Sequence, residues 1–208
     1  ELKKVDNALS MFNQQSVISK VNQGATTIPQ TEEGRMFEEV VSMALNISKE
    51  TEGAFDITVA PLVNAWGFGY KNGALPSPHQ IDSILQFVGM DKIDLNGNDL
   101  VKQDPRMMLD FSSIAKGMAC DEIGRMLVRN GAVNWLVEIG GEVMASGTNS
   151  HGTPWHVSVD MPTSENDGNI QHEGAMVIGL DSGAVATSGN YRKWREEGGN
   201  KLSHIVDP

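Results

Sequence analysis

The sequence predicts an α+β protein in which N-terminal helices pack on a largely antiparallel sheet. Apolar residues recur at helical spacing through most of the first half of the chain. Beyond residue 131 the pattern changes to short β-prone runs separated by Gly, Ser, Asn and Pro. Because helices and strands do not alternate regularly, a doubly wound parallel sheet is disfavoured. The 208 residues contain no internal repeat, and we expect one domain over residues 1–208.

Four segments have the apolar spacing or the end signals of helices. An apolar stripe from Leu2 to Phe12 predicts an opening helix that ends near Asn13. A serine followed by proline and glutamine predicts a capping box, and an Asn-Gly pair is a usual helix stop. The other predicted helices are Glu32–Lys49, one that begins at Ser77-Pro78, and Ile114–Arg129, which ends at Asn130-Gly131.

Strands are predicted mainly in the second half of the chain. An Asn-Gly pair between two short apolar runs is a strong hairpin signal. This hairpin joins Lys92–Leu95 to Leu100–Gln103 around Asn96-Gly97. The polar stretch Pro162–His172 is expected to be a flexible loop. The later predicted strands are Asn134–Ile139, Glu142–Ala145, Trp155–Asp160, Ala175–Leu180 and Ala184–Thr187.

Composition and charge restrict the classes of partner. The formal net charge of −11 argues against nucleic acid or an anionic membrane surface as the main partner. The one cysteine, Cys120, excludes an intrachain disulfide, and its helical spacing with apolar neighbours favours a buried, inert thiol. No apolar run approaches the ~20 residues of a membrane span, and no signal peptide is present. Because the chain begins within an amphipathic pattern and stops at Asp207-Pro208, we expect a piece of a longer protein, truncated at its C-terminus.

The segment from Asp110 to Lys116 is the most informative part of the sequence. A short apolar run leads to a carboxylate, a small-residue turn, and a helix with a lysine in its first turn. Free amides at a helix start with a cation beside them suit a phosphate-bearing ligand. The carboxylate and the turn carbonyls suit a hard metal ion carried by that phosphate. A purely structural strand–turn–helix unit remains an alternative explanation of this segment alone.

Three further glycine-rich or polar turns follow apolar runs, and all could meet at one cleft. Asp56 lies between apolar neighbours, either as a ligand-binding carboxylate or as a cap of the following turn. Paired glycines follow Glu138, which like Glu142 is either a ligand residue or an exposed strand glutamate. In the last turn, His204 is the best candidate for a general base, although a lone histidine is more often structural. No nucleophile elbow, Walker loop or dinucleotide fingerprint occurs, which disfavours serine hydrolases, P-loop enzymes and Rossmann dehydrogenases.

Taken together and in order, these segments resemble the FAD:protein FMN transferase family, also called the ApbE family. Each motif alone is weak, but together in this order they are specific, and the resemblance covers essentially the whole chain. The matching pieces are Leu9–Phe12 leading to Ser16–Asn22, then Ala54–Val63, Asp110–Gly117, Glu138–Glu142, Ala186–Gly189 and Ser203–Pro208.

The resemblance implies an ApbE-like fold and a set of site residues. His204 would be the base, and Lys116 would support the transfer and contact the cofactor. The backbone carbonyl of Ser113 would hold Mg²⁺, while the family's side-chain metal ligands lie beyond the end of this chain. The family often has tyrosine beside the flavin where this sequence has Phe12, which can stack but cannot donate a hydrogen bond. The residues implied to contact FAD are Phe12, Ala54, Phe55, Asp56, Asp110, Lys116 and Ile205.

The activity implied by the resemblance is Mg²⁺-dependent transfer of FMN from FAD to a threonine or serine hydroxyl of an acceptor protein, with release of AMP. The acceptor would be a subunit of a membrane redox complex. Family resemblance also implies export, as a lipoprotein in the periplasm or on the outer face of the cytoplasmic membrane. Three alternatives remain at this stage: a non-catalytic FAD-binding carrier, an FAD pyrophosphatase in which water replaces the hydroxyl, and a structural or interaction domain that does not bind FAD.

Overall fold

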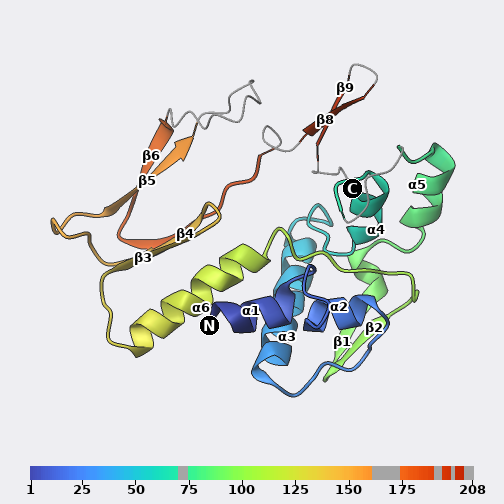
Figure 1. Cartoon of the computed structure of the whole chain (residues 1–208), viewed down its shortest axis with the longest axis horizontal. Coiled ribbons are helices and arrows are strands. Elements are labelled where there is room, and N and C mark those ends of the chain that lie inside the picture. Colours follow the sequence, from blue (N-terminus) through green and yellow to red (C-terminus); the bar gives the residue numbers. More distant parts are fainter. Residues whose placement is uncertain (70–74, 161–173, 190–193, 198–199, 204–208) are drawn as a thin grey trace. The chain divides into compact units, whose positions relative to one another are not determined.

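The computed structural model describes residues 1–69, 75–160, 174–189, 194–197 and 200–203 (Figure 1). These residues form two compact units. The N-terminal unit comprises Leu2–Ala115, and the C-terminal unit comprises Lys116–Ser203 together with Glu1. The predicted loop Pro162–His172 and two site candidates, His204 and Ile205, lie outside the described residues. The expectation of one domain over residues 1–208 stays a prediction.

Helix α3 forms the centre of the N-terminal unit. Thr31 caps its start by accepting a hydrogen bond from the Gly34 amide at 3.2 Å, and two glutamates follow in the first turn, where the helix dipole favours them. Its apolar stripe is buried, and it contacts α1, α2 and β1. The helices of this unit are α1 (Leu2–Leu9), α2 (Val17–Asn22), α3 (Glu32–Glu50), α4 (Ala60–Ala65) and α5 (Pro78–Leu85).

A short hairpin closes the N-terminal unit after α5. The 3-10 turn η1 (Met90–Lys92) leads into β1 (Ile93–Asn96), which pairs antiparallel with β2 (Asp99–Lys102). The two-residue loop therefore begins at Gly97, which has a φ of 61° that favours glycine. The hairpin prediction is confirmed, with the loop one residue further along than the Asn96-Gly97 pair suggested.

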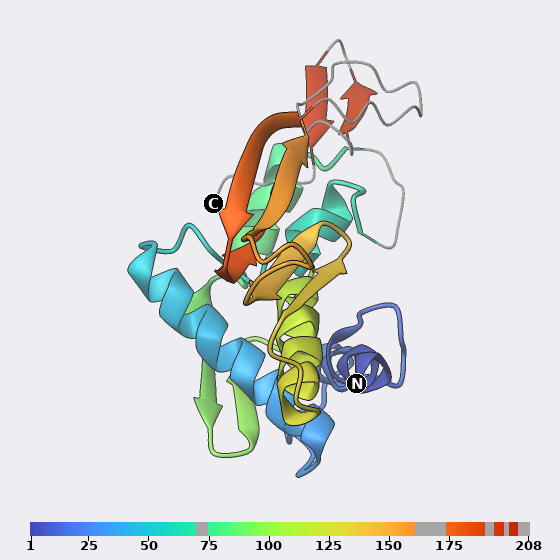
Figure 2. The same cartoon turned by 90° about the vertical axis from the view of Figure 1, so that its left-hand side faces the viewer.

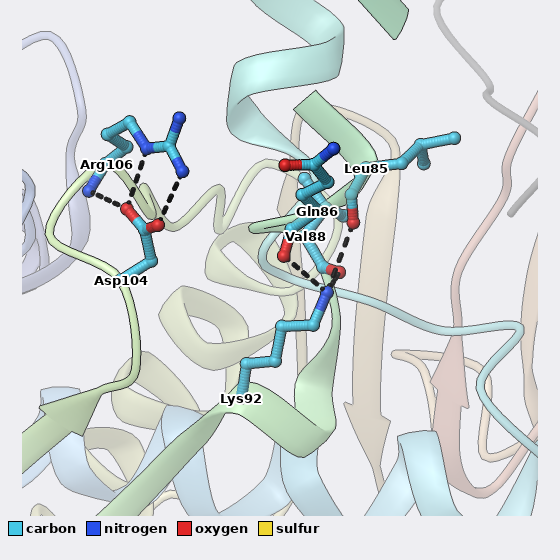
Figure 3. A network of polar contacts seen from close by, with 6 residues as sticks. All are labelled: Leu85, Gln86, Val88, Lys92, Asp104 and Arg106. Atoms are coloured by element: carbon cyan, nitrogen blue, oxygen red, sulfur yellow. Dashed lines mark hydrogen bonds and ion pairs between the residues drawn. The ribbon is translucent and has the colours of Figure 1, made fainter. Parts of the chain in front are cut away.

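The end of α5 is stabilised by a lysine from the next turn. The Nζ atom of Lys92 donates to the carbonyl oxygens of Leu85 at 3.1 Å, Gln86 at 2.9 Å and Val88 at 2.8 Å (Figure 3). An ammonium has three donors, so these three bonds use all of them and satisfy carbonyls that the helix leaves unpaired. This lysine is therefore structural.

In the C-terminal unit, α6 (Ala115–Arg129) leads from the boundary between the units into antiparallel sheets (Figure 2). A three-stranded sheet has the order β3-β4-β7, and two separate pairs join β5 to β6 and β8 to β9. The strands are β3 (Trp135–Ile139), β4 (Glu142–Ser146), β5 (Trp155–Asp160), β6 (Gly174–Leu180), β7 (Ser182–Val185), β8 (Trp194–Glu197) and β9 (Asn200–Ser203).

Helix α6 packs on β3 through a small buried cluster of Cys120, Trp135 and Val137. Gly124 permits this close approach, because a Cβ atom there would lie 2.7 Å from the Trp135 ring. Burial raises the pKa of the Cys120 thiol, so the thiolate is disfavoured. The prediction of a buried, unreactive cysteine is confirmed as far as burial is concerned.

The α+β fold class is confirmed, since the described residues combine helices with sheets whose strand pairs are all antiparallel. Packing of the N-terminal helices on the antiparallel sheet stays a prediction. The opening helix was predicted too long, because α1 ends at Leu9 and not near Asn13. The sequence analysis also missed α2, α4, β8 and β9. No helix in the described part of the chain is long and apolar enough to cross a membrane.

Candidate functional site

Two motif segments of the N-terminal unit lie side by side. The backbone amide of Asp110 donates to the carbonyl of Ile57 at 2.7 Å, and Val59 forms a parallel bridge with Met108. These contacts join the Ala54–Val63 segment to the Asp110–Gly117 segment at the residues next to their carboxylates. The structure therefore brings the neighbourhoods of Asp56 and Asp110 together, as the hypothesis of one site requires.

Asp56 is held by the residue two positions later. Its Oδ1 accepts hydrogen bonds from the Thr58 amide at 2.6 Å and from the Thr58 hydroxyl at 2.6 Å. The same hydroxyl accepts a hydrogen bond from the Gly89 amide at 2.7 Å. Thr58 is fully buried whereas Asp56 is half-buried. The predicted turn cap is therefore present, and the carboxylate it orients still reaches solvent.

Asp110 has the same local geometry, since its Oδ1 accepts a hydrogen bond from the Ser112 amide at 2.7 Å. Its neighbours Leu109 and Phe111 are fully buried, and the Phe111 ring lies 5.3 Å from the ring of Phe37 on α3. The turn is thus anchored by two core residues and exposes Ser112 and Ser113. Ser113 is the residue whose backbone carbonyl is predicted to hold the metal ion.

Lys116 is the first residue of the C-terminal unit, and its side chain lies over the β3–β4 turn. Its Nζ lies 2.6 Å from Oε2 of Glu142 and donates to the Gly140 carbonyl at 3.2 Å. Gly141, in the same turn, lies near the hydroxyl of Thr187. The structure therefore brings together Lys116, the Glu138–Glu142 motif and the Ala186–Gly189 motif within one unit.

Phe12 is a large apolar side chain that faces solvent. It follows α1 in a turn and is 83% exposed. Ala54 is exposed and Phe55 is half-buried. Exposed aromatic rings are suited to stacking on planar ligands. The exposure of these residues is compatible with ligand contact.

Comparison with known proteins identifies the family. The sequence model of the ApbE family matches residues 1–208. The chain belongs to the ApbE family. It is 38% identical over 213 residues to the FAD:protein FMN transferase of Haemophilus influenzae, covering 100% of this chain and 60% of that protein. It is 34% identical over 209 residues to the enzyme of the same name from Vibrio cholerae, covering 100% of this chain and 61% of that protein.

Solved structures of ApbE proteins have the same fold. The flavin transferase ApbE from Vibrio cholerae is similar with a TM-score of 0.82 and 32% identity, over 99% of this chain and 64% of that one. The ApbE protein of Thermotoga maritima gives a TM-score of 0.84 with 27% identity, over 99% of this chain and 66% of that one. The chain thus spans about 60% of the length of the curated relatives it matches.

The oxygen donors of this ApbE family member fit a hard cation only in part. No group of three or more His, Cys, Asp or Glu side chains in the described ranges could hold a metal ion. The turn instead offers the half-buried Asp110 carboxylate and, beside it, the exposed residues Ser112 and Ser113. Mg²⁺ commonly keeps several waters and binds through one or two protein oxygens plus substrate phosphates. The donor set at Ser113 and Asp110 is therefore suitable for Mg²⁺ without completing its coordination.

Two residues that touch the predicted site were not singled out from the sequence. Thr58 orients Asp56, and Asn22 bonds the backbone next to Asp110. Glu142, one of the candidate ligand residues, pairs with Lys116. An Asp-x-Thr spacing is a signal for a side-chain-capped turn and could have indicated Thr58. No local pattern could have indicated Asn22, because its partner lies 87 residues away. The roles of His204 and Ile205 stay predictions.

Proposed function

We propose that the protein is a Mg²⁺-dependent FAD:protein FMN transferase. It moves FMN from FAD to a threonine or serine hydroxyl of an acceptor protein and releases AMP. The observation that carries this proposal is the junction of the two motif segments through the Asp110 amide and the Ile57 carbonyl, in a chain whose relatives bear that name. The exposed residues after Asp110 support the proposal that the diphosphate of FAD binds at this turn.

In the proposed reaction the acceptor oxygen forms a bond to the phosphorus on the FMN side of FAD. The bond from that phosphorus to the bridging oxygen breaks, and the bridging oxygen leaves with AMP. The hydroxyl proton goes to His204, which is suited to accept it near neutral pH. Bound Mg²⁺, held by the Ser113 carbonyl with Asp110 nearby, would supply a Lewis acid that neutralises charge on the phosphoryl oxygens.

Lys116 would act on the diphosphate as a positive charge. Its ammonium is paired with Glu142 and bonded to the Gly140 carbonyl, and its side chain is 45% exposed. An incoming diphosphate would therefore compete with Glu142 for Lys116, whose ammonium is oriented by the β3–β4 turn. The amides of Ser112, Ile114 and Ala115 already donate to the Asp110 carboxylate and the Phe111 carbonyl, so the expectation of free amides at this helix start is wrong for these three.

The proposal extends to partners and location. The acceptor would be a subunit of a membrane redox complex, and the protein would be an exported lipoprotein in the periplasm or on the outer face of the cytoplasmic membrane. Support for these points comes from the family resemblance of the motifs. A flavin joined to a protein through a phosphodiester is a product that such a complex can use for electron transfer.

The test incubates the protein with FAD, Mg²⁺ and a threonine-containing acceptor peptide, and measures AMP and the peptide mass. Transfer predicts AMP together with a peptide heavier by FMN less one water. AMP without a heavier peptide identifies an FAD pyrophosphatase, and bound FAD without AMP identifies a carrier; either result refutes the proposal. His204→Ala is expected to retain FAD binding and lose transfer.

Lys116→Met supplies the matched test of the diphosphate contact. We expect it to weaken FAD binding by about tenfold or more, because a charge-assisted contact to phosphate is lost while the length of the side chain is kept. Lys3→Met is the control, since Lys3 is an exposed residue of α1. Equal FAD affinity in both variants would remove Lys116 from the proposed mechanism.

A further inference from the structure

The side chain of Asn22 pairs with the backbone of Leu109 as a neighbouring strand would. The Leu109 amide donates to Oδ1 of Asn22 at 2.7 Å, and Nδ2 of Asn22 donates to the Leu109 carbonyl at 2.9 Å. Asn22 is the last residue of α2 and lies 87 residues from its partner. One side-chain amide thus satisfies both polar groups of the residue that immediately precedes Asp110.

The segment from Met108 to Asp110 is bonded on its other side by the Ala54–Val63 motif. Asp110 donates to the Ile57 carbonyl at 2.7 Å, and Met108 forms the parallel bridge with Val59. The chain from Met108 to Asp110 therefore runs between the Asn22 amide and the segment that carries Asp56. A displacement of this segment would move both predicted site carboxylates.

A lysine also joins α2 to the segment that leads to Asp110. The Nζ of Lys102, at the end of β2, donates to the Val21 carbonyl at 2.9 Å and to the Met107 carbonyl at 3.2 Å. Lys102 is half-buried, which lowers its pKa by desolvation. Lys102 bonds carbonyls of residues that are not adjacent to Asp110, whereas Asn22 bonds Leu109, which is adjacent to it. Asn22 is therefore the contact that bears most directly on the carboxylate.

We propose that Asn22 is a positioning residue for Asp110 and for the turn that carries Ser113. The inference rests on the proposed function, since it assigns the role of Asn22 through FAD binding at that turn. Binding groups must be held within about 0.5 Å of their productive positions, and side-chain hydrogen bonds to the supporting backbone are a means of doing so. Asn22 supplies two such bonds from outside the local segment.

Asn22→Asp provides a test with a pH signature. The carboxylate still accepts from the Leu109 amide, but it places a second acceptor against the Leu109 carbonyl, which repels it. A protonated carboxyl has one acceptor and one O–H donor, so it restores the pattern of the amide. We expect FAD affinity about tenfold below wild type at about pH 8, with the ratio recovering as the pH falls towards about 5.

The second variant, Asn22→Ala, removes both bonds without adding repulsion. It is expected to lose FAD affinity at every pH, without the recovery seen for Asn22→Asp. Asn134→Asp is the control for the chemistry, because Asn134 Oδ1 also accepts a backbone bond, from the Thr148 amide at 2.9 Å. Leu100→Val is the control for stability, since Leu100 is fully buried in β2. Both controls should keep wild-type FAD affinity below their melting temperatures.

Wild-type affinity in Asn22→Ala overturns the inference while leaving the proposed function intact. Losses of affinity in Leu100→Val that match those of Asn22→Ala at equal melting temperature also overturn it, because the effect would then be one of stability. Failure of the wild-type chain to bind FAD refutes the proposed function and this role together. A pH-dependent recovery confined to Asn22→Asp supports the positioning role.

Discussion

Replacing Thr58 with valine removes one hydroxyl from a fully buried position and leaves the shape of the side chain almost unchanged. Two hydrogen bonds are lost: the bond donated to Asp56 Oδ1 at 2.6 Å and the bond accepted from the Gly89 amide at 2.7 Å. A hydrogen bond to a charged group contributes about 1.5–3 kcal/mol, and an amide left without a partner adds to the loss. We expect the free energy of unfolding to fall by about 2–4 kcal/mol.

The assay is denaturant unfolding of the variant beside Thr27→Val. Thr27 also donates its hydroxyl to an aspartate, Asp99, at 2.7 Å, but this pair is exposed. Thr27→Val should therefore change the free energy of unfolding by no more than about 0.5 kcal/mol. Thr58→Val should in addition weaken FAD binding, because Asp56 keeps only the backbone bond that orients it. If the two valine variants have equal stability and equal FAD affinity, the reasoning from burial and hydrogen bonding is wrong.

Two other predictions concern stability and ionisation. Gly124→Ala should destabilise the protein by about 1–3 kcal/mol, because the new Cβ would lie 2.7 Å from the Trp135 ring. Gly117→Ala in the same helix meets nothing within 4 Å and should stabilise the protein by about 0.5–1 kcal/mol. Thermal unfolding should show a lower melting temperature for the first variant and a higher one for the second. The hydrogen bond from Arg106 lowers the pKa of Asp104 to about 2 (Figure 3). The pair therefore stabilises the fold above the ordinary carboxyl pKa and loses this contribution as the pH falls through about 2. NMR titration should show that Arg106→Gln raises the pKa of Asp104.

The elements that the sequence predicted well have strong local signals. Helix α5 begins at Pro78 because the Ser77 hydroxyl and the Gln80 side chain form a capping box, as the four-residue pattern indicated. Helix α6 stops at Arg129 before Gly131, whose φ is 83°. In such cases a few neighbouring residues determine the boundary, so no knowledge of the tertiary structure is needed.

The missed elements lack such signals or depend on distant partners. Helices α2 and α4 have six residues each, which is too short for a 3.6-residue period to be distinguished from chance. The pairing of Asn22 with Leu109 crosses 87 residues, and a polar side chain gives no sign of which backbone it will bond. Sequence motifs therefore identified the carboxylates of the site, while the residues that orient them became visible only in the structure.

The two ends of the motif from Asp110 to Lys116 are held by different neighbours. Residues up to Ala115 belong to the N-terminal unit, where the buried Phe111 fixes the turn, and Lys116 belongs to the C-terminal unit, where Glu142 and the Gly140 carbonyl fix its ammonium. The carboxylate and the cation proposed for one diphosphate are thus each fixed by their own local contacts. A substitution beside Phe111 is therefore expected to act on the proposed Asp110 contact, and one at Glu142 on the proposed Lys116 contact. Separate measurements of the metal dependence and the FAD affinity of each variant test these two contacts more directly than activity alone.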